Sequence, residues 1–176
     1  MNLLIAEDDF TTLSALEAMT ARLGYTVTSV DDGNTAWQAL HQAAAPTLAL
    51  LDWNMPGLDG LEVIRNVRLQ EARKACYLIL LTASDEKDAV VEALQAGAND
   101  FIHKPCDVRE LQARLAVGAR ALEAEAALGH CKAELEGVLG RITGLQARLH
   151  DCATCPGRKA REARAEVGQC SRIDCS

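Results

Sequence analysis

Four short apolar runs in this chain each end beside a polar residue, and this arrangement restricts the fold more than any other feature. The runs are Leu3–Ala6, Leu48–Leu51, Leu78–Leu81 and Phe101–His103. None of them alternates apolar and polar residues, which is typical of strands buried on both faces of a parallel sheet. Segments with the apolar spacing of helices lie between the runs. We therefore expect an α/β fold, a flavodoxin-like doubly wound sheet of five parallel strands.

The remaining elements follow from composition and from chain-breaking residues. The fifth strand is predicted at Tyr25–Val30, which is rich in β-branched residues. Most of the helical segments have a glycine or a proline at one end, as is typical of helix ends. The predicted helices are Thr11–Leu23, Gly33–Ala44, one that begins near Leu61, Asp85–Ala96, and a last one that begins near Asp107.

The polar residues that follow the runs have a common chemistry. Glu7 and Asp8 follow the first run, Asp52 the second, Thr82 the third and Lys104 the fourth. The carboxyl ends of parallel strands share one edge of the sheet, so these side chains are expected to meet there. Clustered carboxylates suit Mg²⁺, and an aspartate can accept a phosphoryl group. A hydroxyl and an ammonium group would neutralise the phosphoryl oxygens.

Residues 1–120 resemble the receiver domain of bacterial response regulators. Thr82 lies 30 residues and Lys104 52 residues after Asp52, as the family pattern requires. The loop after Asp52 most resembles chemotaxis-type receivers. The matching motifs are Ala6–Asp9, Asp52–Gly60, Leu81–Ala83 and Asn99–Pro105.

The resemblance implies roles for the acidic residues. Asp52 matches the phosphorylated aspartate of the family, and Asp8 matches its direct Mg²⁺ ligand. Glu7 matches the outer acidic partner. Asn54 matches the position whose backbone carbonyl binds the metal. Asp9 is interpreted as a bystander.

The resemblance also implies a switch. Thr82 and Lys104 would contact the phosphoryl group, and Thr82 and Phe101 match the pair that rearranges on phosphorylation. The family often has a cis peptide before the proline that matches Pro105. The implied function is two-component signal transduction through protein–protein contacts, with a histidine kinase or phosphotransfer protein as donor and a downstream protein as target. Such a protein is a phosphoacceptor with self-catalysed phosphorylation and dephosphorylation, and is not classed as an enzyme.

Two other interpretations concern the same residues. Aspartate-based phosphohydrolases also use a nucleophilic Asp, Mg²⁺ and Lys. Their motif has a second Asp two residues after the nucleophile, whereas this chain has Asn54 at that position. A receiver that folds but is never phosphorylated is disfavoured, because no expected side chain is missing.

The last helix is expected to continue beyond the receiver as a stalk over residues 121–150. Apolar residues recur there at alternating steps of three and four, the spacing of a coiled-coil seam. Helix packing back on the receiver is the alternative. We favour a partner-binding stalk and a homodimer, although four glycines weaken the helix. The seam residues are Leu128, Cys131, Leu135, Val138, Ile142, Leu145, Leu149 and Cys152.

The tail, residues 151–176, contains four of the seven cysteines. Cys152 and Cys155 form a C-x2-C pair, and Cys170 and Cys175 follow with a wider spacing. Four thiolates suit a tetrahedral Zn²⁺, with His150 and Cys131 as substitute ligands. A reversible disulfide between the first pair and free thiols are the alternatives. The second function hypothesis is therefore a metal- or redox-sensing adaptor that acts through these cysteines.

Composition limits the partners and the location. Up to Arg120 the chain has 17 acidic and 10 basic residues, so this part is a poor match for nucleic acid. Met1 and the four apolar residues after Asn2 are too short for a secretory signal, and no run is long enough to cross a membrane. We expect a cytoplasmic protein.

Overall fold

The computed structural model describes residues 1–42, 47–70, 75–83 and 87–154. Its centre is a parallel sheet of five strands in the order β2-β1-β3-β4-β5, which confirms the predicted flavodoxin-like architecture. Each apolar run forms a strand within one or two residues of its predicted bounds. The strands are β1 Asn2–Ala6, β2 Thr26–Val30, β3 Leu48–Asp52, β4 Tyr77–Thr82 and β5 Asp100–His103.

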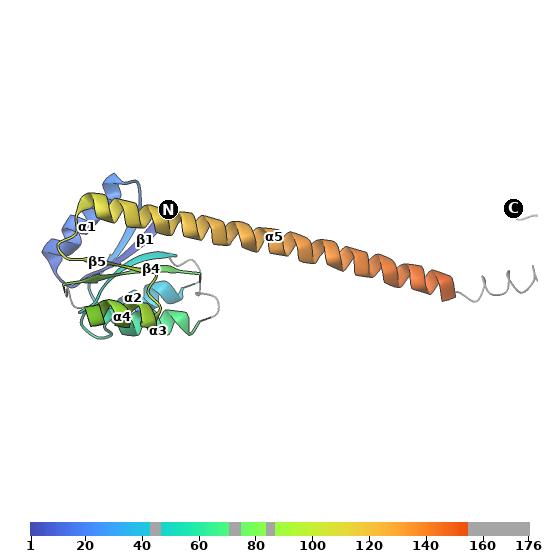
Figure 1. Ribbon diagram of the computed structural model, residues 1–176, viewed down its shortest axis with the longest axis horizontal. Coiled ribbons are helices and arrows are strands. Elements are labelled where there is room, and N and C mark those ends of the chain that lie inside the picture. Colours follow the sequence, from blue (N-terminus) through green and yellow to red (C-terminus); the bar gives the residue numbers. More distant parts are fainter. Residues whose placement is uncertain (43–46, 71–74, 84–86, 155–176) are drawn as a thin grey trace, which may run out of the picture. The chain divides into compact units, whose positions relative to one another are not determined.

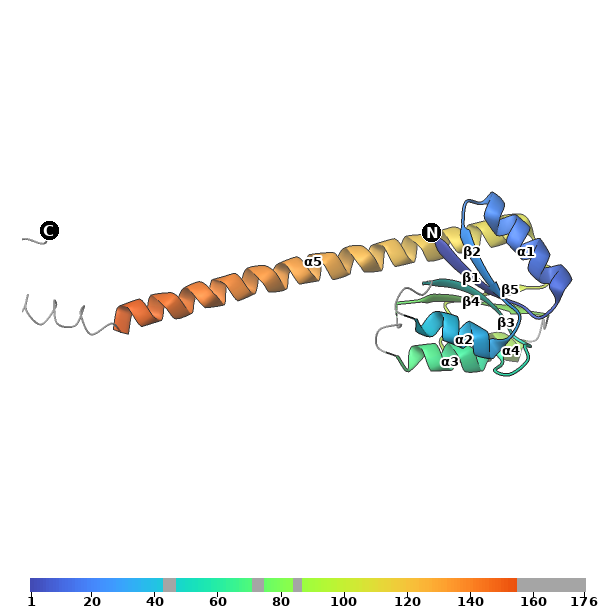
Figure 2. The same cartoon turned by 180° about the vertical axis from the view of Figure 1, so that it is seen from behind.

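Among the described residues, four helices connect the strands and a fifth, α5, follows β5, and together they cover both faces of the sheet. In Figures 1 and 2, α1 and the first part of α5 lie on one face, and α2, α3 and α4 lie on the other. The predicted end of the second helix at Ala44 and the predicted start of the fourth helix at Asp85 lie outside the described residues. The helices are α1 Phe10–Arg22, α2 Gly33–His41, α3 Gly60–Arg68, α4 Lys87–Ala96 and α5 Val108–Thr154.

The apolar core has two layers, one on each side of the sheet. Leu4 and Leu51 belong to the layer that α2, α3 and α4 cover, whereas Leu3 and Leu50 belong to the layer under α1 and α5. Neighbouring residues of one strand thus point to opposite layers, as the pleat of a strand requires. This double burial explains why the central strands are uninterrupted apolar runs.

The expectation of burial on both faces is correct for three runs and wrong for the fourth. Every residue of β3 and β4 is buried, and so is β1 after Asn2. In β5 only Ile102 is fully buried. β5 is an edge strand with one neighbour, so its other side chains are partly exposed. β2, at the opposite edge, is partly exposed for the same reason.

Close backbone packing fixes the loop after β3. The Gly60 N–H donates to the Trp53 carbonyl at 2.9 Å, which closes the loop at the start of α3. A Cβ at Gly60 would lie 2.2 Å from the carbonyl oxygen of Asp52, so only glycine fits there. Asp59 caps α3 in a capping box with Glu62. The end of β3 is therefore held by the helix that follows it.

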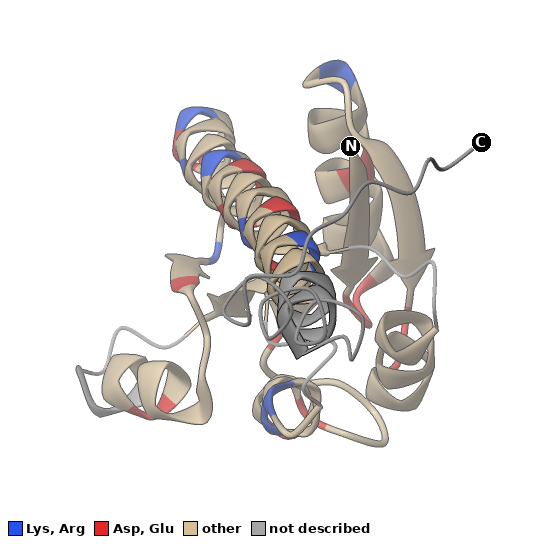
Figure 3. Ribbon diagram, turned by 90° about the vertical axis from the view of Figure 1, so that its right-hand side faces the viewer, with Lys and Arg blue, Asp and Glu red and all other residues tan. Residues whose placement is uncertain are grey.

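The chain divides into two units, Met1–Ala126 and Ala127–Ser176, and α5 contributes to both. α5 is one continuous helix of 47 residues, which confirms the predicted helical extension. Basic and acidic residues are both distributed along it, as the blue and red bands in Figure 3 show. Every described side chain from Glu123 to Gln146 is exposed, including the apolar side chains of the predicted seam. Among the described residues, no helix has the length and apolarity needed to span a membrane.

Candidate functional site

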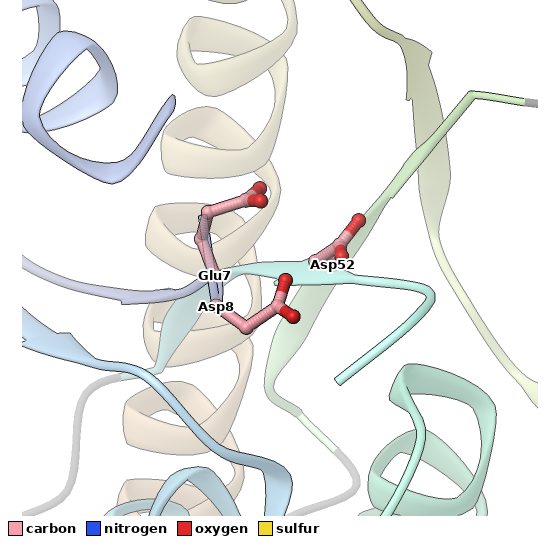
Figure 4. Close-up of side chains that lie close together, drawn as sticks. All are labelled: Glu7, Asp8 and Asp52. Carbon is pink, nitrogen blue, oxygen red and sulfur yellow. The ribbon is translucent and has the colours of Figure 1, made fainter. Parts of the chain in front are cut away.

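The site lies at the carboxyl ends of β1 and β3, the two central strands from which the chain winds in opposite directions. Glu7 and Asp8 follow β1 directly, and Asp52 is the last residue of β3. One carboxylate oxygen of each residue lies within 4.8 Å of the others, and Figure 4 shows the three side chains side by side. Ligands of doubly wound sheets bind at such a point of reversal.

Lys104, directly after β5, forms ion pairs with the acidic cluster. Its Nζ lies 2.7 Å from Oδ1 of Asp52 and 2.6 Å from Oε2 of Glu7. It also donates a hydrogen bond to Oε1 of Glu7 at 2.8 Å. Glu7 and Asp52 are buried, with exposed fractions of 1% and 5%. The ammonium group thus connects two carboxylates that are 45 positions apart in the sequence.

Burial and the ion pairs act in opposite directions on these groups. Burial raises the pKa of Asp52 and of Glu7, and the nearby Lys104 only partly offsets this effect. Burial lowers the pKa of Lys104, but its hydrogen bonds to Asp52 and Glu7 more than compensate, so its pKa is raised. Lys104 therefore remains a cation.

The residues present fit a divalent cation. Three carboxylates and one ammonium group leave a formal charge of about minus two when all are ionised, which such an ion would balance. Asp8 is exposed, so the cluster is open to solvent on one side. Mg²⁺ prefers a few carboxylate oxygens together with water, as this arrangement allows.

Asp9 has a different role from Asp8. Its Oδ1 accepts hydrogen bonds of 2.8 Å from the backbone N–H and the hydroxyl of Thr12, so Asp9 is the N-cap of α1. These hydrogen bonds lower the pKa of Asp9. Its carboxylate is committed to the helix, and it is not among the residues of the acidic cluster.

The other residues of the predicted site surround this cluster. Thr82 ends β4, next to β3, and is buried. Asn54 is exposed and follows β3 by two residues. Phe101 lies on β5 and is partly buried, with its ring edge-to-face against His103. The Lys104–Pro105 peptide is cis, as the resemblance implied.

The tail cysteines are not part of this geometry. Cys155, Cys170 and Cys175 lie outside the described residues, and Cys152 is described only as part of the α5 backbone. The substitute ligand Cys131 is an exposed free thiol on α5. The zinc prediction therefore stays a prediction.

Two features near the site were not predicted from the sequence. Arg114 of α5 contacts both Asp100 and the ring of Phe101. In the sequence Arg114 looks like any charged residue on an exposed helix face, so neither contact could be predicted. A groove of about 460 Å³ also opens beside Lys104, between α1 and residues 104–106. Its lining, which includes Leu16 and Met19, is mostly apolar.

Comparison with known proteins agrees with this geometry. Residues 3–116 match the family model described as the response regulator receiver domain. The chain is 35% identical over 116 residues to the chemotaxis protein CheY of Pseudomonas aeruginosa, an alignment that covers 65% of this chain and 93% of that protein. It is 39% identical over 116 residues to the response regulator RppA of Synechocystis, covering 65% of this chain and 49% of that protein.

Solved structures of receiver domains also align with this chain. The receiver domain of the sensor histidine kinase PA1611 of Pseudomonas aeruginosa, described with a magnesium ion coordinated in its active site cleft, aligns with a TM-score of 0.60 at 35% identity, over 69% of this chain and 97% of that one. The receiver domain of a histidine kinase from Syntrophus aciditrophicus aligns with a TM-score of 0.61 at 32% identity, over 70% of this chain and 90% of that one.

Proposed function

Because this chain belongs to the response regulator receiver family, we propose that it is switched by phosphorylation of Asp52. Receiver domains of two-component systems accept phosphoryl groups, so the family supports the general function, and the proposal concerns which residues carry it out here. One observation carries the proposal. Asp52 is buried at the point where the sheet reverses, in contact with Lys104 and beside two further carboxylates.

The proposed reaction is a transfer to a carboxylate. One oxygen of Asp52 forms a bond to phosphorus while the bond from phosphorus to the donor breaks. Lys104 already contacts Asp52, and it would follow the negative charge to the phosphoryl oxygens. The hydroxyl of Thr82, at the end of the adjacent strand, would donate a hydrogen bond to one of those oxygens.

Mg²⁺ is part of the proposal. The residues that would hold it are Asp8 and Asp52, the backbone carbonyl of Asn54, and Glu7 as the outer acidic partner. When bound, the ion would balance charge on the transferring phosphoryl group. Asp52 would lose its phosphoryl group by hydrolysis at the same site, so the chain resets itself and is a phosphoacceptor and not a separate enzyme.

The proposed partners are proteins. A histidine kinase or phosphotransfer protein donates the phosphoryl group, and a downstream protein reads the result in the cytoplasm. The apolar groove beside Lys104 would give a donor protein a surface next to Asp52. Thr82 and Phe101 would change position together on phosphorylation, which would alter the surface near α4, β5 and α5. We propose no DNA-binding output and no membrane contact.

The stalk is proposed to bind a second copy of this chain. The leucine, isoleucine and valine side chains of the seam between Leu128 and Leu145 are all exposed, with exposed fractions of 40% to 68%. The seam has the three-and-four spacing of a dimeric coiled coil. The homodimer would bring two receivers under joint control. The corresponding division of the chain is a receiver at 1–120, a stalk at 121–150 and a tail at 151–176.

Zinc binding by the tail is a separate proposal. It depends on the spacing of Cys152, Cys155, Cys170 and Cys175 in the sequence. Few large apolar residues follow Pro156, and metal ligation would supply folding free energy to such a segment. Elemental analysis of protein purified without chelator tests it, with one equivalent of zinc per chain expected. Zinc well below one equivalent, with four freely titrating tail thiols, would leave the cysteines without a metal role.

The central test uses the amide variant Asp52→Asn, which has nearly the same shape as wild type but cannot form an acyl phosphate. We expect full loss of phosphorylation by acetyl phosphate with Mg²⁺, measured as intact mass. The matched control is Asp59→Asn, which removes a carboxylate from the same loop and retains a side chain that caps α3. The control is expected to accept phosphate like the wild type. An acid-labile phosphate on Asp52→Asn at wild-type extent would contradict the assignment.

A further inference from the structure

The ring of Phe101 lies beneath a guanidinium group. The central carbon of the Arg114 guanidinium is 5.7 Å from the ring centroid, which is within the range of a cation–π contact. The ring centroid of His103 lies 5.4 Å away, with an interplanar angle of 80°. Phe101 is on the edge strand β5 and is partly buried, so Arg114 and His103 contact a ring that is still partly exposed.

Arg114 is held in place by two carboxylates. Its Nη1 donates to Oδ1 of Asp100 at 2.6 Å, and its Nε and Nη2 donate to Oε1 of Glu110 at 3.0 Å. Oδ1 of Asp100 also accepts the backbone N–H of Phe101 at 2.9 Å. The guanidinium is therefore anchored to both β5 and α5, and it cannot follow the ring if the ring moves.

We propose that Arg114 is a positioning residue that holds Phe101 under its guanidinium, in a partly exposed position, and so opposes the phosphorylated state. This inference rests on the proposed function, in which Phe101 moves toward Thr82 after Asp52 is modified. The inward movement breaks the contact with the anchored guanidinium. A cation–π contact at a partly exposed site changes an equilibrium by about two- to fivefold. Removing the contact shifts the ring inward and strengthens binding of a phosphoryl mimic by that factor.

A purely structural role predicts a different result. If Arg114 only ties α5 to β5, then loss of the Asp100 carboxylate, its partner on β5, should have the same effect as loss of Arg114 itself. Arg114→Lys keeps a cation that can pair with Asp100 but lacks the planar group that covers the ring. Asp100→Asn removes the ion pair that ties α5 to β5, and it leaves the guanidinium hydrogen-bonded to Glu110 of its own helix. The two variants therefore separate ring positioning from helix attachment.

The chain has two phenylalanines, which makes the ring position measurable. Protein labelled with 4-fluorophenylalanine should give one fluorine resonance from Phe101 and one from Phe10, which is 80% exposed on α1 and serves as an internal reference. The Phe10→Leu variant assigns the two signals. Beryllofluoride with Mg²⁺ is the phosphoryl mimic, and its affinity is measured by titration.

We expect Arg114→Lys to shift the Phe101 resonance without the mimic, to leave the Phe10 resonance in place, and to raise beryllofluoride affinity about two- to fivefold. Arg114→Gln should do the same, and Asp100→Asn should match the wild type in beryllofluoride affinity. An unchanged Phe101 resonance in Arg114→Lys, or an equal rise in beryllofluoride affinity in Asp100→Asn, would overturn the proposal. Failure of the wild type to bind the mimic would instead contradict the proposed function, because the fluorine comparison without mimic still tests the ring contact.

Discussion

At the scale of single residues, Asp8 and Asp9 are adjacent in the sequence but belong to different parts of the molecule. Asp8 is in the acidic cluster with Glu7 and Asp52. Asp9 caps α1 through two hydrogen bonds from Thr12. The difference follows from the strand end, because the chain turns into the helix immediately after Asp8.

We predict that Asp8→Asn weakens Mg²⁺ binding by about tenfold or more, whereas Asp9→Asn changes it little. The amide at position 8 is a poorer metal ligand than a carboxylate, and the amide at position 9 still caps the helix. Titration of Mg²⁺ followed by Trp53 fluorescence measures both, since Trp53 adjoins Asp52. Equal losses in the two variants would show that the cluster is assigned one residue out of register.

The sequence predicted that the acidic residues and Lys104 lie together, but not which of their atoms are in contact. The residues at the carboxyl ends of β1, β3, β4 and β5 were predictable because uninterrupted apolar runs identify parallel strands, whose carboxyl ends must meet. The direct contacts of Lys104 with Glu7 and Asp52 depend on side-chain geometry that spacing does not encode. The cap at Asp9 did have a signal, since an Asp before a helical pattern is a common N-cap.

At the scale of elements, α2 shows how a single cap couples a helix to pH. Asp32 is the N-cap of α2, and it accepts hydrogen bonds from the backbone N–H and the hydroxyl of Thr35. These bonds hold the pKa of Asp32 below its ordinary value of 3.8. The ionised form is thus favoured in the folded state. Its stabilising contribution is complete above pH 3.8 and is lost as the pH falls through the lower, folded-state pKa.

We predict that the difference in melting temperature between wild type and Asp32→Asn decreases as the pH is lowered below this range. Asparagine also caps helices but does not titrate, so only the wild type loses its contribution in acid. Thermal unfolding followed by circular dichroism across the acid range measures the difference. Asp31→Asn is the matched control, because it removes the same charge from the neighbouring residue. A difference for Asp32→Asn that is constant with pH would contradict the assignment.

The predicted burial of the strands differed from the structure mainly at β5. Its run Phe101–His103 looked like that of a central strand, but a three-residue run is too short to distinguish an edge from a centre. An edge position is a property of topology, since it depends on whether another strand follows on that side. The last helix, in contrast, was recognisable because its apolar spacing continues well past the end of the receiver.

At the scale of the whole molecule, the stalk should determine the oligomeric state. We predict that Leu135→Glu, which places a charge in the exposed seam, weakens self-association of the full-length chain by an order of magnitude or more. Ala133→Glu adds the same charge on the opposite side of the helix and should have little effect. Sedimentation of both variants, with and without beryllofluoride and Mg²⁺, measures this. A wild-type chain that stays monomeric at high concentration in both conditions would rule out the dimer.

The position of Asp52 as the last residue of β3 makes the chain far more sensitive to changes in length than to changes in side chain. Asp52 pairs in register with Leu81 of β4, and successive residues of β3 point to opposite sides of the sheet. Apolar substitutions within the strand leave that register intact. Deleting or inserting one residue there would turn Asp52 away from Lys104 while a hydrophobic strand remained. Within β3, natural variation must therefore preserve the number of residues, which sets the register, more strictly than the identity of the apolar side chains.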